Sequence, residues 1–367
     1  MLQAARTLAL YLSVLPVLLL AHAALASPPA RLVPRFPPAA IWNQDISAAA
    51  PDADSSTMIN ASIGWGTGSS GNTKFQIDFS MHVVFSSWGN TTSQPLVQRD
   101  GYYLPDCDTG LSVPLPATGA IEGSGDYSCS GGDCHLLVVN GDALYESWLS
   151  NVNSDGIQSQ CMVTWHLNRV YPADGRGEQC TSADAAGFPI APLLFNPDEV
   201  YAAMQVPNGD LGHAIRFILP NTRMRAGRYV HPASHAGGPS GPANAIPYGA
   251  RLRLASSFNI TGYNAAAQVI LRTLKRYGMF LADGGSIPLT ADDGLFTTHQ
   301  WTDPDIDLDS HSLFGVSLDD FEVMPIGTPI VLTNDCVRNP DYTIYADGFN
   351  WQRTRGHAQL CLSITHI

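Results

Sequence analysis

Charged residues are scarce in this sequence, and basic residues are the scarcer kind. Asp, Glu, Lys and Arg make up 14% of the 367 residues, whereas a typical soluble domain has about 25%. The 19 Lys and Arg are outnumbered by 32 Asp and Glu, which gives a formal net charge of −13. Because phosphate groups attract basic surfaces, this balance argues against nucleic acids and anionic membranes as partners.

Apolar runs of membrane-spanning length are also lacking after the N-terminus. Residues 1–26 have the features of a secretory signal peptide, with Arg6, an apolar stretch over 8–20 and a small-residue cleavage site at Ala24 and Ala26. Residues 27–40 are rich in Pro and Ala and predict an extended leader. We therefore expect a secreted protein with no membrane association after the signal is removed.

Two motifs of catalytic and metal sites are missing as well. The sequence contains no Cys-x-x-Cys pair, which disfavours a zinc site, and no Gly-x-Ser-x-Gly, which disfavours a serine nucleophile. Seven cysteines are nevertheless present, and in an oxidising compartment they should pair. Loop length favours Cys129–Cys134, Cys161–Cys180 and Cys336–Cys361, leaving Cys107 over. Connectivity cannot be derived from sequence, and Cys107 could replace either member of the first pair.

No internal repeat and no linker divides the rest of the chain. We expect one β-rich domain over residues 41–326, followed by a disulfide-bounded C-terminal extension over 327–367 that packs on it. Alternating runs such as 75–81 and 213–218, and the buried run 135–139 before Asn140-Gly141, predict many short strands. Residues 265–282 predict one amphipathic helix that stops at Gly284-Gly285. The fold class is therefore mainly β, a β-sandwich or jelly roll with one packed helix.

Several carboxylates are candidates for acid–base chemistry. Cleavage of a glycosidic bond needs one protonated and one ionised carboxyl group. The catalytic candidates are Glu146, Asp184 and Glu199, and Glu122 and Asp126 lie on an earlier loop. The aromatic neighbours of Glu146 suit both sugar stacking and a raised carboxyl pKa. The competing interpretations are a solvent-facing strand residue for Glu146 and a loop cap for Asp184.

Histidine and arginine side chains support a different reaction. His213 and His235 could transfer protons or position a sugar, although a strand histidine is as often a core residue. If they converge, a lyase becomes possible, in which a histidine removes a proton and arginine neutralises a uronate. The candidates for substrate binding are His135, Trp148, Arg216, Arg251 and Arg253.

Alternating aspartates and three sequons complete the candidate sites. Asp303, Asp305, Asp307 and Asp309 would point one way in an extended chain and could hold a structural Ca²⁺, but an acidic surface loop is favoured. Leu308 and Phe314 stand where an EF-hand needs Gly and Glu, so we predict no metal or cofactor beyond that weak candidate. Asn-x-Ser/Thr sequons are present at Asn60, Asn90 and Asn259.

The order of short motifs resembles a widespread group of secreted, mostly bacterial and mostly uncharacterised proteins. The motifs are His135-Leu-Leu-Val-Val, Leu144-Tyr-Glu, Thr181-Ser-Ala-Asp-Ala-Ala-Gly, Asp198-Glu-Val, Gly212-His-Ala-Ile-Arg-Phe, Ala233-Ser-His, Gly249-Ala-Arg-Leu-Arg-Leu, Lys275-Arg-Tyr-Gly-Met and Leu281-Ala-Asp-Gly-Gly. The resemblance covers residues 41–324, ends after Pro325 and departs at Gly284, where Asn is expected. These proteins often accompany carbohydrate-binding modules, so the resemblance implies an extracellular setting with polysaccharide.

Together these features favour a secreted glycoside hydrolase acting on an extracellular polysaccharide. Two alternatives stay open: a non-catalytic glycan-binding or cell-surface protein, and a polysaccharide lyase.

Overall fold

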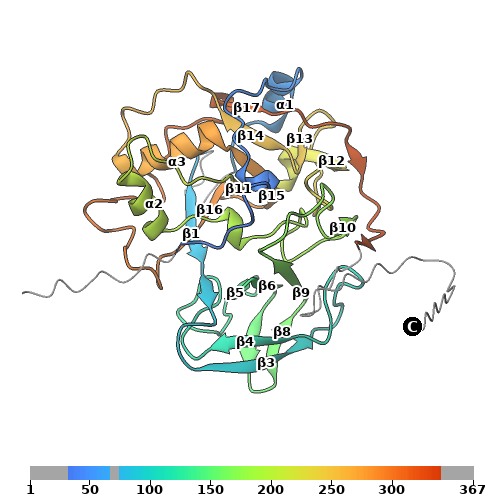
Figure 1. The fold of residues 1–367 in the computed structure, drawn as a ribbon. Coiled ribbons are helices and arrows are strands. Elements are labelled where there is room, and N and C mark those ends of the chain that lie inside the picture. Colours follow the sequence, from blue (N-terminus) through green and yellow to red (C-terminus); the bar gives the residue numbers. More distant parts are fainter. Residues whose placement is uncertain (1–31, 67–73, 340–367) are drawn as a thin grey trace, which may run out of the picture.

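The computed structural model describes residues 32–66 and 74–339, arranged in two lobes (Figure 1). The large lobe holds a six-stranded sheet and the three α-helices of the described residues, and the small lobe is built from strands β2 to β9. The prediction of a mainly β chain is confirmed. The signal peptide, residues 27–31 of the leader and residues 340–367 of the extension lie outside the described residues.

The six-stranded sheet of the large lobe is mixed rather than purely antiparallel. Strand β1 runs parallel to β16 and β11 runs parallel to β15, whereas β14 is antiparallel to both β15 and β17. The strand order is β1 (Ile77–Met81), β16 (Leu289–Asp292), β11 (Ile215–Leu219), β15 (Met279–Gly284), β14 (Arg251–Leu254) and β17 (Phe321–Val323).

Helix α3 (Ala265–Arg276) packs against β14 and α2 and is shorter than predicted. It begins at Asn264, whose side chain accepts a hydrogen bond from the Ala267 N–H. Gly278, with φ of 66°, turns the chain out of the helix, so Met279 already belongs to β15. The prediction of a helix to residue 282 is therefore wrong at its C-terminal end. The other helices are α1 (Ser55–Ser62) and α2 (Pro197–Met204).

The small lobe consists of two four-stranded sheets. One has the order β2 (Val83–Phe85), β5 (Leu136–Asn140), β6 (Ala143–Trp148) and β9 (Cys161–His166), and the other has the order β4 (Ser112–Pro116), β3 (Thr91–Gln98), β8 (Gly156–Ser159) and β7 (Asn151–Asn153).

Alternation along β5 divides its side chains between two hydrophobic cores. Leu136 and Val138 join β4 residues in a small core inside the lobe. Leu137 and Val139 instead belong to the main core, which continues into the large lobe. The sheet of β5 is thus a middle layer between the rest of the small lobe and the large lobe.

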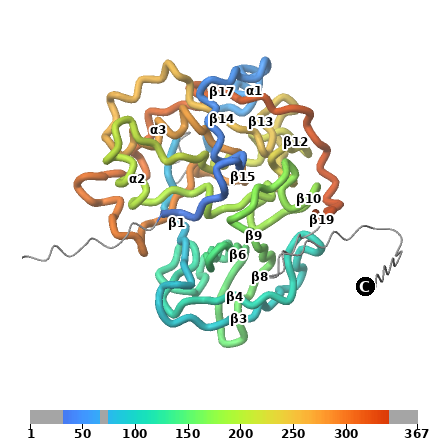
Figure 2. The backbone as a smooth tube through the Cα atoms, viewed as in Figure 1, coloured from blue at the N-terminus to red at the C-terminus, as the bar shows by residue number. Residues whose placement is uncertain are grey.

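Short strands at the C-terminal end of the described chain fasten a strap, residues 327–339, to the large lobe. Strand β18 (Ile330–Val331) pairs with β12 (Met224–Tyr229), which also pairs with β13 (Ile246–Tyr248). Strand β19 (Val337–Arg338) pairs with β10 (Gly177–Glu178), and the two are labelled beside each other in Figure 2. The 3-10 helices are η1 (Ile41–Asn43), η2 (Ala191–Leu193), η3 (Asn221–Arg223) and η4 (Leu318–Asp320).

Three disulfides join the described cysteines. Cys129–Cys134 is present as predicted, but Cys107 bonds Cys161 and Cys180 bonds Cys336. The predictions of Cys161–Cys180 and Cys336–Cys361 are therefore wrong, and Cys361 lies outside the described residues. Short loops misled the prediction because Cys180 and Cys336, 156 residues apart, are brought together by the pairing of β10 with β19.

The predicted leader takes part in the fold from residue 33 onwards. Val33, Phe36 and Ala40 are buried in the main core, so the packed chain begins before residue 41. Among the residues described, none of the helices combines the length and the apolar character needed to cross a membrane.

Candidate functional site

A row of polar side chains crosses the six-stranded sheet. Asp78 of β1 is in register with Thr290 of β16, and Thr290 accepts a hydrogen bond from Arg216 of β11 at 3.2 Å. The same guanidinium lies 2.5 Å from Asp184 and 3.9 Å from Asp283 of β15. Arg216 is almost fully buried, so it serves as the internal counter-ion of these carboxylates.

Asp184 belongs to the loop Thr181-Ser-Ala-Asp-Ala-Ala-Gly187, which it also organises. Its Oδ1 accepts hydrogen bonds from the Ala186 and Phe188 N–H groups, and its Oδ2 accepts from Arg216. Gly187 has φ of 78°, and a Cβ there would lie 2.1 Å from the Ser234 hydroxyl. Burial raises the pKa of Asp184 to about 7, against the attraction of Arg216. With no exposed surface, Asp184 holds the loop and is closed to a substrate.

His135 is held as a charged imidazolium beside Glu122. Its Nδ1 lies 2.6 Å from Glu122 Oε2, and its Nε2 lies 3.0 Å from the carbonyl oxygen of Ala183. Both partners can only accept from an N–H, so the ring carries two protons. Burial works against that charge, but the facing carboxylate outweighs it and raises the pKa of His135 to about 9.

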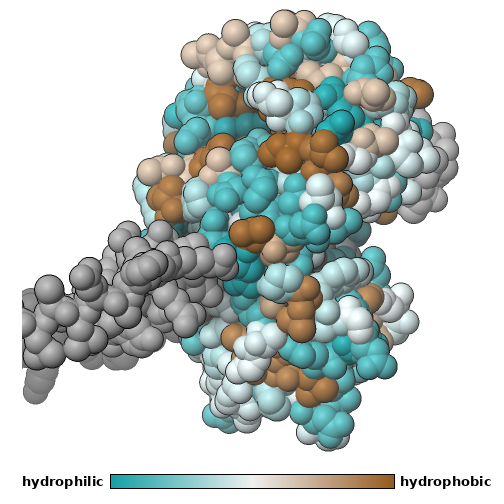
Figure 3. All heavy atoms as spheres, turned by 90° about the vertical axis from the view of Figure 1, so that its right-hand side faces the viewer, coloured by the Kyte–Doolittle hydropathy of each residue, from teal (hydrophilic) through white to brown (hydrophobic). Residues whose placement is uncertain are grey.

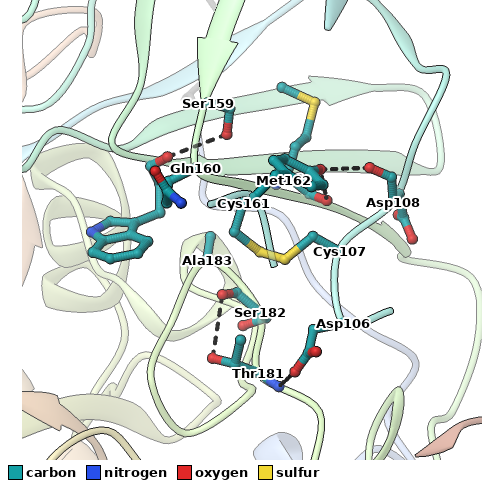
Figure 4. The surroundings of a disulfide bond; sticks show 12 residues. Asp106, Cys107, Asp108, Ser159, Gln160, Cys161, Met162, Thr181, Ser182 and Ala183 are labelled. Carbon is teal, nitrogen blue, oxygen red and sulfur yellow. Dashed lines mark hydrogen bonds between the residues drawn. A yellow bond between two sulfur atoms is a disulfide. The ribbon is translucent and has the colours of Figure 1, made fainter. Parts of the chain in front are cut away.

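A pocket of about 260 Å³ lies between the two lobes. The space-filling view in Figure 3 shows a waist between the lobes, and Figure 4 shows the Cys107–Cys161 disulfide beside the Thr181–Ala183 segment. The small lobe contributes Tyr103, Asp133, His135 and Trp148, and the large lobe contributes Thr181, Ser182, Ala183, Ala185, His235, Gly237, Asp283 and Gly284.

The pocket has an aromatic wall and an acidic wall. The rings of Tyr103 and Trp148 have centroids 5.9 Å apart, and the Trp148 indole N–H donates to Asp133 at 2.5 Å. On the large-lobe side, the Asp283 side chain is 30% exposed and accepts from the Gly284 N–H at 2.6 Å. Burial raises the pKa of Asp283, against the opposing effect of Arg216.

His235 lines the same pocket and is oriented from two sides. Its Nδ1 lies 3.0 Å from the carbonyl oxygen of Ala185, which fixes a proton on that nitrogen. Its Nε2 lies 2.9 Å from the amide oxygen of Asn334 in the strap. Both ring nitrogens of His235 therefore face acceptor oxygens.

Gly284 leaves room for a neighbouring side chain. A Cβ at this position would lie 2.7 Å from the Asn221 amide oxygen, so the asparagine expected from the resemblance would force Asn221 to move.

Glu146 lies outside the pocket and is a structural carboxylate. Its Oε1 accepts hydrogen bonds of 2.8 Å from the Ile190 and Ala191 N–H groups, and it has no exposed surface. Burial raises the pKa of Glu146 to about 7, despite those two donors. The prediction that Glu146 is catalytic is wrong, because its carboxyl group is buried where the lobes meet and a substrate cannot reach it.

Glu199 and His213 form a separate buried group with Arg35. Arg35 makes an ion pair with Glu199, and His213 Nε2 lies 3.7 Å from the same carboxylate oxygen. His213 Nδ1 donates to the Ala214 carbonyl oxygen at 2.7 Å, so this nitrogen carries the proton. Burial lowers the pKa of His213 to about 4, and the ring is neutral. Neither residue lines the pocket, which corrects their placement among the catalytic candidates.

Arg251 and Arg253 also have structural roles, because their guanidinium groups donate to backbone carbonyl oxygens. Arg251 donates to the backbone carbonyls of Gln44 and Tyr277, and Arg253 donates to those of Ile46 and Ala49. Their predicted role in substrate binding fails because both guanidinium groups anchor the N-terminal segment to β14. His213 and the two arginines thus do not assemble the site that a lyase was expected to use.

The alternating aspartates do not form a calcium site. Residues 303–306 form a bend and a turn, and residues 307–309 belong to no strand, so the assumed extended geometry is wrong. Asp303 accepts from the Gln300 N–H and Asp309 from the His311 N–H. Within residues 32–66 and 74–339, no three acidic, histidine or cysteine side chains are placed to hold a metal ion.

The three sequon asparagines are exposed, but Asn60 differs from the others. It stands in helix α1, and its sequon partner Ser62 is fully buried. Asn90 lies in a bend just before β3, and Asn259 lies just before a turn at 261–262.

Three of the pocket residues that were not among the candidates carry the site's acidic and aromatic walls: Asp283, Tyr103 and Asp133. Asp283 carried a usable signal, because it stands at the end of a strand in Leu281-Ala-Asp-Gly-Gly. Tyr103 and Asp133 carried none, since both lie in loops whose place is set by the two disulfides of the small lobe. Of the predicted residues, His135, Trp148 and His235 do meet in the pocket.

Comparisons with protein-family models, curated proteins and solved structures found no match to this chain.

Proposed function

We propose that the protein is a secreted glycoside hydrolase that acts on an extracellular polysaccharide in the pocket between the lobes. The observation that carries the proposal is the pairing of an aromatic wall with a half-buried carboxyl group of raised pKa in one pocket. Aromatic rings stack on the apolar faces of sugars, and a carboxyl of raised pKa can donate a proton to a leaving oxygen.

Asp283 is the proton donor in this proposal. Its carboxyl faces the pocket, whereas Asp184 and Glu146 are sealed from it. Burial raises the pKa of both Asp283 and its neighbour Asp184, against the attraction of the Arg216 guanidinium that they share, and this favours a protonated Asp283. Protonation of the glycosidic oxygen by Asp283 breaks the bond to the anomeric carbon.

His235 is the base that activates water. In the neutral ring the Ala185 carbonyl keeps the proton on Nδ1, so Nε2 has a lone pair that can accept a proton from a water molecule at the anomeric carbon. The amide oxygen of Asn334 faces Nε2 and has to give way to this water molecule.

Secretion is supported by the disulfides, which persist in oxidising compartments, and by the signal-like residues 1–26. The resemblance to secreted proteins found with polysaccharide-binding modules points the same way.

The test is product analysis on neutral, amino-sugar and uronate polysaccharides, following reducing ends and the absorbance of unsaturated uronates together. Hydrolysis produces new reducing ends without that absorbance. Absorbance rising in step with reducing ends would mean a lyase and would overturn the proposal.

A glycan-binding protein without catalysis is the second candidate. Tyr103 and Trp148 would suffice for binding, and His135 has both ring nitrogens occupied by hydrogen bonds within the protein, so it is not free to transfer a proton. Retained binding of a glycan with no cleavage of any polysaccharide in the panel would establish this alternative.

A further inference from the structure

We infer that the pocket selects a glycan carrying free amino groups over its N-acylated form, and that it rejects uronates. This inference rests on the proposed function, because it names the substrate class of the same pocket. It comes from two independent features: the balance of charge around the pocket and the chemistry of the aromatic wall.

The charge around the pocket is negative, and its cations are already neutralised. Arg216 is buried and paired with Asp184, and His135 is paired with Glu122. Among the pocket-lining residues of the described chain, none is Lys or Arg. A uronate carboxylate would therefore lose its water shell and find no free cation in return.

One acidic side chain of the lining, Asp133 on the small lobe, has no basic side chain at salt-bridge distance among the described residues. Asp283 on the large lobe faces Arg216 and is the proton donor of the proposed reaction, so the attraction argued here does not depend on it. Asp133 is exposed to solvent and keeps an acceptor oxygen beside the aromatic rings. An ammonium group entering the pocket thus meets the Asp133 carboxylate beside the aromatic wall.

The aromatic wall adds a second attraction for the same group. The hydrogen bond from the Trp148 indole places the Asp133 carboxylate at the edge of that ring, and the Tyr103 ring lies beside it. Aromatic faces attract cations, and an ammonium group held by rings and a carboxylate together combines both terms. N-acylation removes the charge and both attractions with it.

The experiment measures binding of three tetrasaccharides by calorimetry: glucosamine, N-acetylglucosamine and galacturonate. We expect the glucosamine tetramer to bind about tenfold more tightly than the acetylated one, with no binding of the galacturonate. Raising the salt concentration should weaken binding of the amine form alone. Asp133→Asn should remove most of the preference, because it weakens binding of the glucosamine tetramer more than binding of the acetylated one.

The matched control is Asp126→Asn, which removes a fully exposed carboxylate outside the pocket and should leave the preference intact. Equal or tighter binding of galacturonate, or a preference that survives Asp133→Asn, would overturn the inference.

Reducing-end release, followed separately, distinguishes this inference from the proposed function. Amine-selective binding without any cleavage would overturn the hydrolase and keep the selectivity. Cleavage without an amine preference would overturn the selectivity and keep the hydrolase.

Discussion

Glu146 shows how a carboxylate can have a raised pKa without taking part in chemistry. It binds the Ile190 and Ala191 N–H groups at the start of η2 and so joins β6 of the small lobe to the large lobe. The same burial that raises its pKa also keeps substrate away.

Replacing this residue separates its structural role from catalysis. Glu146→Ala leaves two buried N–H groups without an acceptor and should lower the free energy of unfolding by about 3 to 5 kcal/mol. Glu146→Gln keeps an acceptor oxygen and should lower it by about 1 to 2 kcal/mol. Urea unfolding measures both variants. A large loss of kcat in folded Glu146→Gln would contradict the structural role.

The His135–Glu122 pair should make the free energy of unfolding fall as the pH rises into the alkaline range. The pKa of His135 is about 9 in the folded protein and about 6.5 in an unfolded chain. A group whose folded pKa is raised contributes fully below the unfolded pKa and loses that contribution as pH rises through the folded pKa.

We therefore expect the free energy of unfolding to fall between pH 6.5 and about 9, with a contribution of about 3 kcal/mol from this pair. Urea unfolding across that range measures it, and His135→Gln should show a correspondingly smaller fall. An identical pH dependence in the variant and the wild type would show that the pair is not the cause.

At the scale of elements, the strap of residues 327–339 holds one wall of the pocket. Gln179 donates to the Val331 carbonyl and accepts from the Thr333 N–H, and Cys336 bonds Cys180 just before the loop of Asp184. The strap also brings Asn334 to His235.

Removing this disulfide should destabilise the protein more than removing the short-range one. Cys180 and Cys336 are 156 residues apart, and Cys129 and Cys134 are 5 apart. The chain-entropy account gives about 5 and about 2 kcal/mol for loops of these lengths. Paired Cys→Ala variants, compared by their urea midpoints, test the order. A larger loss from the Cys129–Cys134 variant would contradict the anchoring role of the strap.

The helices and strands were predictable where the local sequence pattern determines them. They were less predictable where contacts between distant segments determine them. Alternation identified β1 and β11, and the apolar periodicity identified α3. The end of α3 was misplaced because Met279 and Leu281 continue the apolar pattern, although Gly278 breaks the helix. The disulfide of the strap could not be predicted, since it depends on a strand pairing between distant segments.

At the scale of the whole molecule, the pocket exists because two lobes meet. The sequence left open whether Glu146 faces solvent on its strand, and only its contact with Ile190 and Ala191 of the large lobe decides that it is buried. For the same reason His135, Trp148 and His235 were identified as candidates, whereas Asp283 was recognised only once both walls were known.

Cleavage by Asp283 is the central claim, and comparing wild type, Asp283→Asn and Glu146→Gln on one glycan tests it most directly. The account predicts that Asp283→Asn lowers kcat/KM for reducing-end release by at least about 100-fold while glycan binding persists. Glu146→Gln, a matched carboxyl-to-amide change outside the pocket, should stay within about twofold of wild type. Wild-type rates in Asp283→Asn, or no reducing ends from any glycan with the wild type, would contradict it.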